Sequence, residues 1–417
     1  MIRRIPDRNI WLVFFAIFLV GIAYGVSISL TAIHLDARGF GKEQIGTLAA
    51  WFAGGIVVLS LPMGALIRLF SAKAALLASV LGYALCVSIF PHLTTYAGIA
   101  GARFFDGAFS VGVWVSCETI LLSRAETDHK AFVTSLYAVS MAIGYVLGPF
   151  VARAIVASLS MALAFGTSGV LATSAAAVAL FLDRDLPSHP AAHGGAAARP
   201  AASAGEEGAA PIGSLALLAR IKTSCFATFA YGYFQASVVL FLPLYLMEEK
   251  AILREQTIII PAFFAMGMLL FSNVAGVIGD RVGHLLVMRV LGAIGTTMIL
   301  GFVFLDAYPL MCAAVFVAGA SLASISPVSL ALQGVIVEPS EYSRSNAIYN
   351  VFYAAGMLLG PPVSSVLFAR GGGAVMLEHL AALWVAFVAF AWLFAADDPR
   401  ARRAADRGTV AAQEPAA

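Results

Sequence analysis

Charged residues are scarce in this 417-residue chain. Asp, Glu, Lys and Arg make up only 12% of it, while hydrophobic residues make up 61%. A soluble domain usually contains ~25% charged and ~45–50% apolar residues. So few charges could not cover the surface of a water-soluble fold of this length, whereas a lipid bilayer requires an apolar outer surface. The sequence therefore predicts a membrane protein.

The sequence also lacks the patterns of several other functional classes. It has no C-x-x-C pair, metal-ligand cluster, phosphate-binding loop or nucleophile–base pair, so we expect no enzyme, no ATP-driven pump, no bound metal and no cofactor. The net charge is only +2 and no basic patch is interleaved with aromatics, so we expect no nucleic-acid partner. The four cysteines lie far apart inside apolar runs and are interpreted as small core residues: Cys86, Cys117, Cys225 and Cys312.

Long apolar runs fill most of the chain. About 20 apolar residues are needed for a helix to cross a ~30 Å hydrocarbon core. The runs do not alternate in hydrophobicity as membrane strands do, so the expected fold class is all-α with twelve transmembrane helices. The predicted spans are 10–33, 44–66, 74–91, 96–122, 132–155, 159–182, 218–246, 256–279, 285–305, 308–336, 343–369 and 374–396.

One segment interrupts this pattern. Residues 183–213 are rich in Ala, Gly and Pro with scattered charge, a composition that cannot bury a core and predicts a flexible linker. It separates an N-terminal six-helix bundle, residues 1–182, from a C-terminal one, residues 214–397. The polar tail at 398–417 is expected to be disordered.

The distribution of Lys and Arg predicts the orientation. With the N-terminus placed inside, 18 of the 25 basic residues fall on the inner side, 6 on the outer side, and Arg103 inside a span. By the positive-inside rule both termini and the linker are expected to be cytoplasmic, in a plasma (inner) membrane. The chain is expected to act as a monomer.

The sequence repeats itself at an offset of 212 residues. Residues 44–64 match 256–276 at seven of 21 positions, and residues 137–151 match 349–363 at seven of 15. Biased composition alone gives roughly one or two matches in such windows. A repeat of six helices gives two halves that cross the membrane in the same direction, which is one known transporter plan with a site between the halves near the midplane.

The fourth predicted span carries the most unusual chemistry. Arg103 and Asp106 are three residues apart and share a helix face, and Trp114 and Glu118 follow them. Charges inside a span are costly and usually face a cavity or each other, so these four residues are candidates for proton coupling or substrate binding. The alternative is a pair that only neutralises itself. Glu118 lies about 18 Å beyond Asp106 along the helix and is better suited to tying loops together.

Polar stripes at helical spacing occur on the first, seventh and tenth predicted spans. We expect them to line a central cavity, although small polar residues also mediate helix packing. The stripes consist of Tyr24, Ser27 and Thr31; of Ser224, Thr228, Tyr231 and Gln235; and of Ser326, Ser329 and Gln333.

A loop after the eighth span carries a family resemblance. Gly276-Val-Ile-Gly-Asp280-Arg281-Val-Gly283-His284 resembles the G-x-L-x-D-R-x-G-R loop motif of the major facilitator superfamily. The resemblance implies that family's two-bundle fold and a latch on the cytoplasmic side.

The first copy of this loop departs from the motif. After Gly64, Arg68 stands where the acid is expected, and Ser71 replaces a glycine. This copy is either a weaker latch or only a cationic inner loop.

Two further motifs resemble the family. Arg103-x-x-x-Gly107 is similar to its R-x-x-Q-G signature, whose arginine is associated with proton coupling or substrate binding. Gly144-x-x-x-Gly148-Pro149 is similar to a fifth-span motif associated with antiporters. That motif recurs as Gly356-x-x-x-Gly360-Pro361 in the eleventh span, so it also fits gate-helix packing in both halves.

A narrower resemblance is to the YcaD-like branch of uncharacterised carriers. It depends on Arg103 to Glu118, on Leu242-Pro-Leu-Tyr-Leu246, and on Asp280-Arg-Val-Gly283 followed by residues 285–289. The branch implies transport of a small solute without naming one.

Together these features predict a secondary active transporter that moves a small solute by alternating access. We expect the proton to be the coupling ion, through Asp106, and antiport to be slightly favoured, with efflux and uptake both left open as the direction. The alternative is a non-transporting membrane sensor or scaffold on the same fold. Sugars, amphiphilic drugs and zwitterions all suit a cavity with one acid, one base and several hydroxyl and amide groups.

Overall fold

The computed structural model describes residues 7–126, 129–183, 213–338 and 341–395. These residues are almost entirely helical and contain no strand. The predicted linker, apart from its two end residues, and the whole predicted tail lie outside the described residues.

The N-terminal bundle contains six long helices and one short 3₁₀ turn. They are α1 (Arg8–Ala37), α2 (Lys42–Phe70), α3 (Ala72–Ile89), η2 (Phe90–His92), α4 (Tyr96–Arg124), α5 (Lys130–Ser158) and α6 (Met161–Leu180).

The C-terminal bundle follows the same plan with more interruptions. Its elements are α7 (Ser214–Glu248), α8 (Arg254–Thr257), α9 (Ile260–Val282), α10 (His284–Phe302), α11 (Tyr308–Ala318), the π-helical turn η4 (Gly319–Ala323), α12 (Ser324–Ile336) and α13 (Tyr342–Leu393). The tenth predicted span corresponds to α11, η4 and α12 in a continuous run.

The predicted twelve spans are recovered once α13 is divided. Eleven helical stretches of the described residues are long and apolar enough to cross a membrane. One of them, α13, has 52 residues and would measure about 78 Å if straight, far more than a bilayer. Gly372 breaks it, with φ 84° and ψ 173°, values that favour glycine. The first arm (342–371) and second arm (373–393) are therefore separate spans, and the all-α, twelve-helix prediction is confirmed.

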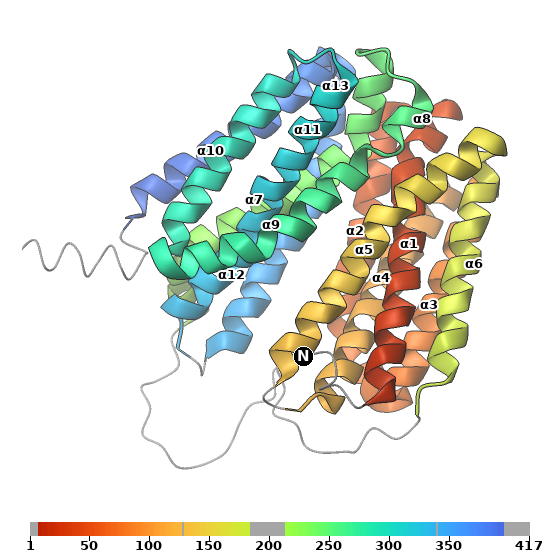
Figure 1. Cartoon of the computed structure of the whole chain (residues 1–417), viewed down its shortest axis with the longest axis horizontal. Helices are drawn as coiled ribbons and strands as arrows, with labels where there is room; N and C mark the ends of the chain where they lie inside the picture. Colours follow the sequence, from red (N-terminus) through yellow and green to blue (C-terminus); the bar gives the residue numbers. More distant parts are fainter. Residues whose placement is uncertain (1–6, 127–128, 184–212, 339–340, 396–417) are drawn as a thin grey trace, which may run out of the picture.

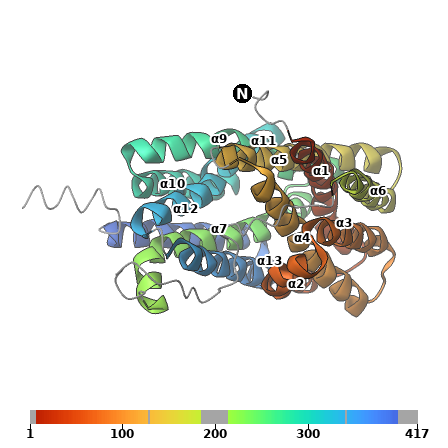
Figure 2. The same cartoon turned by 90° about the horizontal axis from the view of Figure 1, so that it is seen from below.

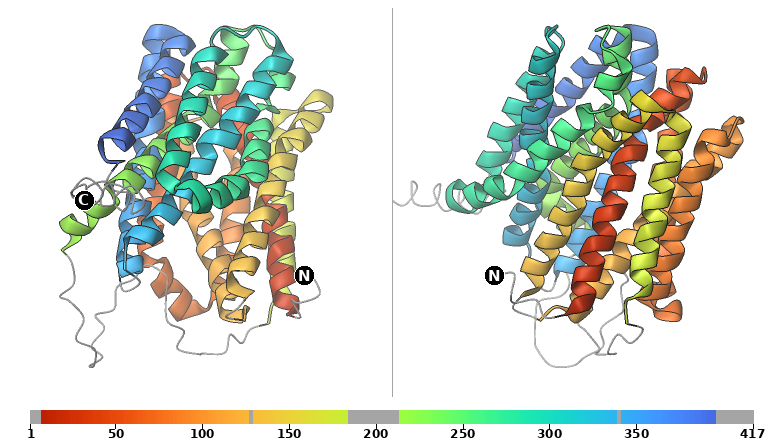
Figure 3. Two further views of the ribbon diagram at one scale, coloured as in Figure 1. Left: turned by 60° about the vertical axis from the view of Figure 1, so that its left-hand side comes forward. Right: turned by 45° about the vertical axis from the view of Figure 1, so that its right-hand side comes forward.

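The two bundles lie side by side (Figures 1 and 2). We call the end of the molecule where α1 and α7 begin the linker face, and the end with the α1–α2 loop and Gly372 the far face. The helices of the two bundles approach one another at the far face and diverge toward the linker face (Figure 1). In the left view of Figure 3 the start of α1 and the start of α7 both lie toward the lower end of the molecule.

Reciprocal glycine contacts make the sequence repeat visible in three dimensions. Gly107 on α4 lies against the Phe52 carbonyl of α2, and Gly55 on α2 lies against the Phe104 carbonyl of α4. The same arrangement occurs 212 residues later, where Gly319 meets the Phe264 carbonyl and Gly267 meets the Phe316 carbonyl. A Cβ on any of these glycines would overlap a carbonyl oxygen, so the backbones cross as closely as they can.

The glycines of the antiporter-like motif occupy a second pair of crossings. In the N-terminal bundle, Gly144 and Gly148 on α5 contact the backbone of α1 around Gly21 and Gly25. In the C-terminal bundle, Gly356 and Gly360 on the first arm of α13 contact the backbone of α7 at Phe229 and Tyr233. The structure therefore places both copies of the motif at helix crossings inside a bundle.

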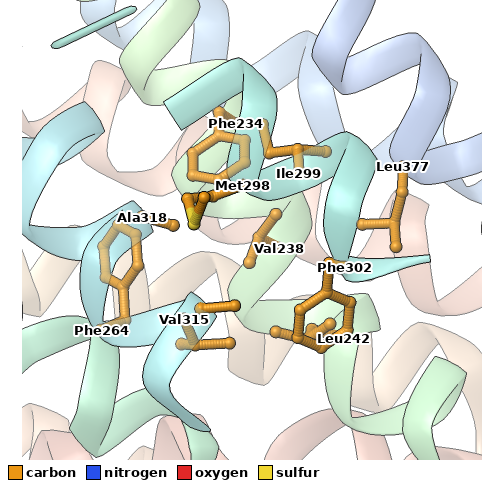
Figure 4. Close-up of a pocket in the computed structure, with 11 residues that line it drawn as sticks. Phe234, Val238, Leu242, Phe264, Met298, Ile299, Phe302, Val315, Ala318 and Leu377 are labelled. Atoms are coloured by element: carbon orange, nitrogen blue, oxygen red, sulfur yellow. The ribbon is translucent and has the colours of Figure 1, made fainter. Parts of the chain in front are cut away.

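A small cavity lies inside the C-terminal bundle (Figure 4). It measures about 30 Å³ and is lined by apolar side chains, among them Phe234, Val238, Met298 and Ala318. With no polar group to orient a solute, this space is a gap in the packing of the bundle and does not resemble a transport site.

Substituting the crossing glycines tests the inferred geometry. Gly107→Ala and Gly319→Ala should each lower the midpoint of thermal unfolding in detergent by several degrees, because each Cβ forces a backbone apart. Gly101→Ala, on the same helix as Gly107 but with open space at its Cβ position, is the control and should leave the midpoint unchanged or raise it. Equal midpoints for Gly107→Ala and Gly101→Ala would contradict the close crossing.

Candidate functional site

The charged pair predicted on the fourth span is formed inside the N-terminal bundle. Arg103 Nη1 lies 2.5 Å from Asp106 Oδ2, and the two side chains are only 13% and 12% exposed. The Arg103 guanidinium also lies 4.4 Å from the centre of the Phe52 ring on α2. Asp106 Oδ1 and Arg103 Nε are buried and have no hydrogen-bond partner among the described residues. The pair is thus electrically neutral but leaves one carboxylate oxygen unpaired.

Aromatic side chains surround this pair on the N-terminal side. The Tyr24 ring on α1 lies 4.4 Å from Tyr83, 6.0 Å from Tyr145 and 6.2 Å from Trp114, measured between ring centres. Tyr24, Tyr83 and Tyr145 lie within electrostatic reach of Asp106. Tyr24 Oη and Trp114 Nε1 are buried and, like Asp106 Oδ1, have no partner among the described residues.

The C-terminal bundle presents a second aromatic wall. Tyr231 on α7 stacks on Tyr353 of α13, with ring centres 6.1 Å apart and planes 27° from parallel. Tyr353 donates a hydrogen bond to Gln235 Oε1 at 3.1 Å, and Tyr231 donates to the Met268 sulfur at 3.7 Å. Tyr349 donates to the Ser326 carbonyl and pairs with the Ser329 hydroxyl.

The two walls meet at the boundary between the bundles. Tyr145 of the N-terminal bundle lies within electrostatic reach of both Tyr231 and Tyr353. We call the set Tyr24, Tyr83, Asp106, Trp114, Tyr145, Tyr231, Gln235 and Tyr353, together with Arg103, the central site. It draws on α1, α3, α4, α5, α7 and the first arm of α13, and thus on both halves of the repeat.

Several predicted cavity residues instead connect helices within one bundle. Ser224 donates to the Ser329 carbonyl at 2.9 Å, and Gln333 donates to the Ser345 hydroxyl at 2.8 Å. Thr31 donates to the Ser27 carbonyl of its own helix, and the Ser27 hydroxyl pairs with Tyr83. These side chains make interhelical and intrahelical hydrogen bonds. Thr228 is fully buried, and its hydroxyl has no hydrogen-bond partner among the described residues.

Glu118 is separated from the central site. It lies twelve residues beyond Asp106 on α4, about 18 Å nearer the linker face. It is exposed and forms no ion pair among the described residues. The neighbouring Tyr137 on α5 is within electrostatic reach, and its buried hydroxyl has no partner there.

Four residues of the site region were not predicted: Tyr83, Tyr145, Tyr349 and Tyr353. They lie on α3, α5 and α13, outside the four spans expected to line the cavity. The sequence does place two of them beside the repeated glycine motif, because Tyr145 follows Gly144 directly and Tyr353 precedes Gly356 by three residues. Close helix crossings at these glycines bring the tyrosines toward the boundary between the bundles.

The far face carries an ion pair between the bundles that the sequence did not indicate. Lys42 Nζ at the start of α2 lies 2.7 Å from Glu248 Oε2 at the end of α7. Lys42 also lies 4.7 Å from the centre of the Phe368 ring. One turn further along α2, Gly46 packs against Ser365 and the Pro361 carbonyl of α13. These contacts close the far face between the two halves.

The linker face carries the predicted latch loops. Asp280 pairs with His284 at 3.1 Å, and Gly283 ends α9 with φ 112°. At the equivalent position of the first copy, Ser71 adopts φ 80° and ψ 153°, a conformation that is strained for a residue with a side chain. The Ser71 hydroxyl accepts a hydrogen bond from the Ala74 amide, which caps α3.

The other predicted gating residues lie in the same loops. Arg281 is exposed on α9, whereas Gly276 is half-buried with open space at its Cβ position. Arg68 is exposed on α2 and extends back toward Gly64. Both loops therefore share the backbone turn of the motif, although the first lacks its acid and its glycine.

Comparison with known proteins now decides the family. The model described as Major Facilitator Superfamily matches residues 13–305 and 224–415. This chain belongs to the major facilitator superfamily. It is therefore a multi-pass membrane transporter by family, with the two-bundle fold expected from its motifs.

Curated relatives in the superfamily cover nearly the whole chain. One is an uncharacterized MFS-type transporter named YcaD from Escherichia coli O7:K1, 23% identical over 387 residues, covering 93% of this chain and 94% of the relative. Another, from Enterobacter sp. strain 638, is 23% identical over 393 residues with the same coverage. The resemblance to YcaD-like transporters is thus confirmed.

Solved structures of superfamily members share the fold. The nucleoside transporter NupG has a TM-score of 0.74 at 14% identity, covering 94% of this chain and 99% of its own. A bacterial homolog of the human lysosomal transporter Spinster, in an inward-facing and occupied conformation, has a TM-score of 0.73 at 12% identity, covering 94% and 96%. Identities this low show the fold alone.

Charge reversal tests the contact at the far face. In a background with Cys86, Cys117, Cys225 and Cys312 replaced by Ala, we introduce Ser365→Cys, which is buried under Gly46. Lys42→Glu should repel Glu248 and speed labelling of this cysteine by a water-soluble thiol reagent, by several-fold at low salt. The double variant Lys42→Glu/Glu248→Lys should restore slow labelling. Unchanged labelling in the single variant would show that the pair does not hold this face closed.

The strained turn of the first latch gives a matched pair of stability tests. Ser71→Gly should raise the thermal midpoint, because relief of the positive φ outweighs loss of the cap, which costs only a few tenths of a kcal/mol on replacement by Gly. Gly283→Ser should lower the midpoint by an amount equivalent to about 1–2 kcal/mol. If Ser71→Gly destabilises the protein, the backbone at this position is not strained as described.

Proposed function

We propose that this protein is a secondary active transporter that moves a small solute by alternating access, coupled to protons through Asp106. The main support is the neutral but incompletely satisfied Arg103–Asp106 pair inside the N-terminal bundle. It lies within electrostatic reach of Tyr145, which in turn reaches Tyr231 and Tyr353 of the C-terminal bundle. The two bundles approach each other at the far face and diverge at the linker face. Family membership supports transport, and the central site supplies a place where a proton and a solute can affect each other.

The chemistry of the pair suits coupling. If a proton binds Asp106, Arg103 loses its counter-charge, and an unpaired buried charge costs about 3–5 kcal/mol. Arg103 has a second partner within reach, because its guanidinium already lies over the Phe52 ring of α2. Protonation therefore favours a shift of Arg103 toward α2.

The helix α2 connects this event to the far face. The same helix carries Phe52 at its middle and Lys42 and Gly46 at the end that closes the far face. A displacement of α2 relative to α7 and α13 would open that face and let the linker face close. We infer that the far face is extracellular, from the basic residues on the linker side. Antiport is slightly favoured, because a proton and a solute donor would compete for the one free oxygen of Asp106.

Transport in proteoliposomes tests the coupling. A solute taken from a thermal-shift screen of the purified wild type is supplied with and without an imposed pH gradient. In Asp106→Asn, the stimulation of uptake by the pH gradient should be at least ten-fold smaller than in the wild type. Exchange of labelled for unlabelled solute should be retained. The control is Asp306→Asn, which changes the same chemical group at a side chain that is 90% exposed on the far face. Gradient-driven uptake that survives in Asp106→Asn would rule out Asp106 as the coupling group.

A sensor or scaffold built on this fold is the competing function. It would hold one arrangement of the two bundles, so single cysteines at Tyr24 and Gln235 would show one fixed accessibility to a water-soluble thiol reagent. Transport requires that each becomes accessible from either side of the membrane in turn.

A further inference from the structure

We propose that the central site binds neutral, flat nitrogen heterocycles of two or three fused rings that carry at least one N–H donor and one acceptor. The inference names a substrate class for the same site and so depends on the proposed function. It follows from the unpaired polar atoms, from the shapes of the walls and from the net charge.

The unpaired atoms define which polar groups the ligand must present. Asp106 Oδ1 is an acceptor and calls for an N–H or O–H on the ligand. Trp114 Nε1 is a donor only and needs an acceptor on the ligand, while the Tyr24 hydroxyl can either donate or accept a hydrogen bond. All three are buried, so leaving them unpaired is unfavourable and pairing them with a ligand is favourable. A hydrocarbon could not use these groups.

The walls favour a flat ligand. Tyr24 and Tyr145 stack within 18° of parallel on one side, and Tyr231 and Tyr353 stack within 27° on the other. Faces of this kind bind aromatic rings by offset stacking. A sugar offers no π-face to four such rings. The amide of Gln235, held by Tyr353, adds one polar group on the C-terminal wall.

The charges exclude ionic ligands. Arg103 and Asp106 cancel at 2.5 Å, and the walls of the central site bring no other charge. A cation would meet Arg103 and an anion would meet Asp106, and either would place an uncompensated charge in a buried site. A neutral ligand avoids this cost.

The spacing along α4 sets the size. Asp106 and Trp114 are eight residues apart, which is about 12 Å between their Cα atoms, and Tyr24 on α1 lies near both. Their side chains reduce that span but leave it longer than a single six-membered ring. Two or three fused rings, with a donor toward Asp106 and an acceptor toward Trp114, match it.

Equilibrium binding to the purified full-length protein in lipid nanodiscs tests this class. The probes are theophylline and caffeine, two neutral purine-type rings that differ by one N–H replaced with N–CH₃, together with the flat tricyclic lumichrome. We expect theophylline and lumichrome to bind, and caffeine to bind at least ten-fold more weakly than theophylline. Glucose, benzoate and ethidium, which represent a sugar, an anion and a flat cation, should not compete.

Conservative variants assign the binding to these atoms. Tyr24→Phe and Trp114→Phe keep an aromatic ring while removing the unpaired hydroxyl or N–H, and each should weaken theophylline binding by about three- to ten-fold. Trp384→Phe is the control, because Trp384 is also fully buried with an Nε1 that has no partner among the described residues, and its ring packs against Phe234 and Phe387 in the C-terminal core.

The outcomes separate this inference from the proposed function. If none of the heterocycles binds, or if theophylline and caffeine bind equally, the substrate class is wrong, while pH-driven transport of another solute can still establish the proposed function. If ethidium or benzoate displaces theophylline, the charge argument fails. If the heterocycles bind as expected but no solute is transported, the proposed function fails and the binding site stands.

Discussion

A bilayer does not tolerate an isolated charge, and this constraint shapes the N-terminal half of the molecule. Arg103 and Asp106 can reside inside α4 only because each neutralises the other at 2.5 Å and because an aromatic shell from α1, α2, α3 and α5 encloses them. One carboxylate oxygen of Asp106 pairs with Arg103, and the other has no partner among the described residues. Any event that changes the charge of Asp106 must therefore move Arg103 or bring in a new partner, which ties local protonation to helix position.

The two halves share their backbone architecture but differ in their buried charged and polar side chains. Reciprocal glycine crossings recur at an offset of 212 residues, so α2 and α4 approach each other as α9 and η4 do. The charged pair of α4 is not repeated: Val315 and Ala318 stand where Arg103 and Asp106 would be, and there the C-terminal bundle has apolar packing. The C-terminal wall contributes stacked tyrosines and one amide instead. In the proposed mechanism the N-terminal half responds to protons and the C-terminal half supplies binding surface.

The number and class of the helices followed from run length and hydropathy, because a bilayer fixes both. The repeat predicted which backbones cross, since only glycine permits such contact. Part of the candidate site could be named from the sequence: Asp106 as a charge inside a span, and Tyr24, Tyr231 and Gln235 from helical spacing. Spacing does not tell which way a polar stripe faces. Ser224 and Gln333 form hydrogen bonds to other helices of their own bundle. Tyr145 and Tyr353 lie on helices whose orientation toward the other bundle depends on tertiary packing. The Lys42–Glu248 contact joins residues 206 positions apart and has no local signal.

The central claim is that the two faces open in alternation around the central site. Distances between pairs of spin labels test it most directly, with Thr94 and Asp306 labelled on the far face and Phe70 and Val282 on the linker face, all four being exposed in the described chain. Lowering the pH across the titration of Asp106 should lengthen the Thr94–Asp306 distance and shorten the Phe70–Val282 distance together, and Asp106→Asn should remove that response. Distances that stay fixed, or that change at both faces in the same direction, would contradict alternating access coupled to this residue.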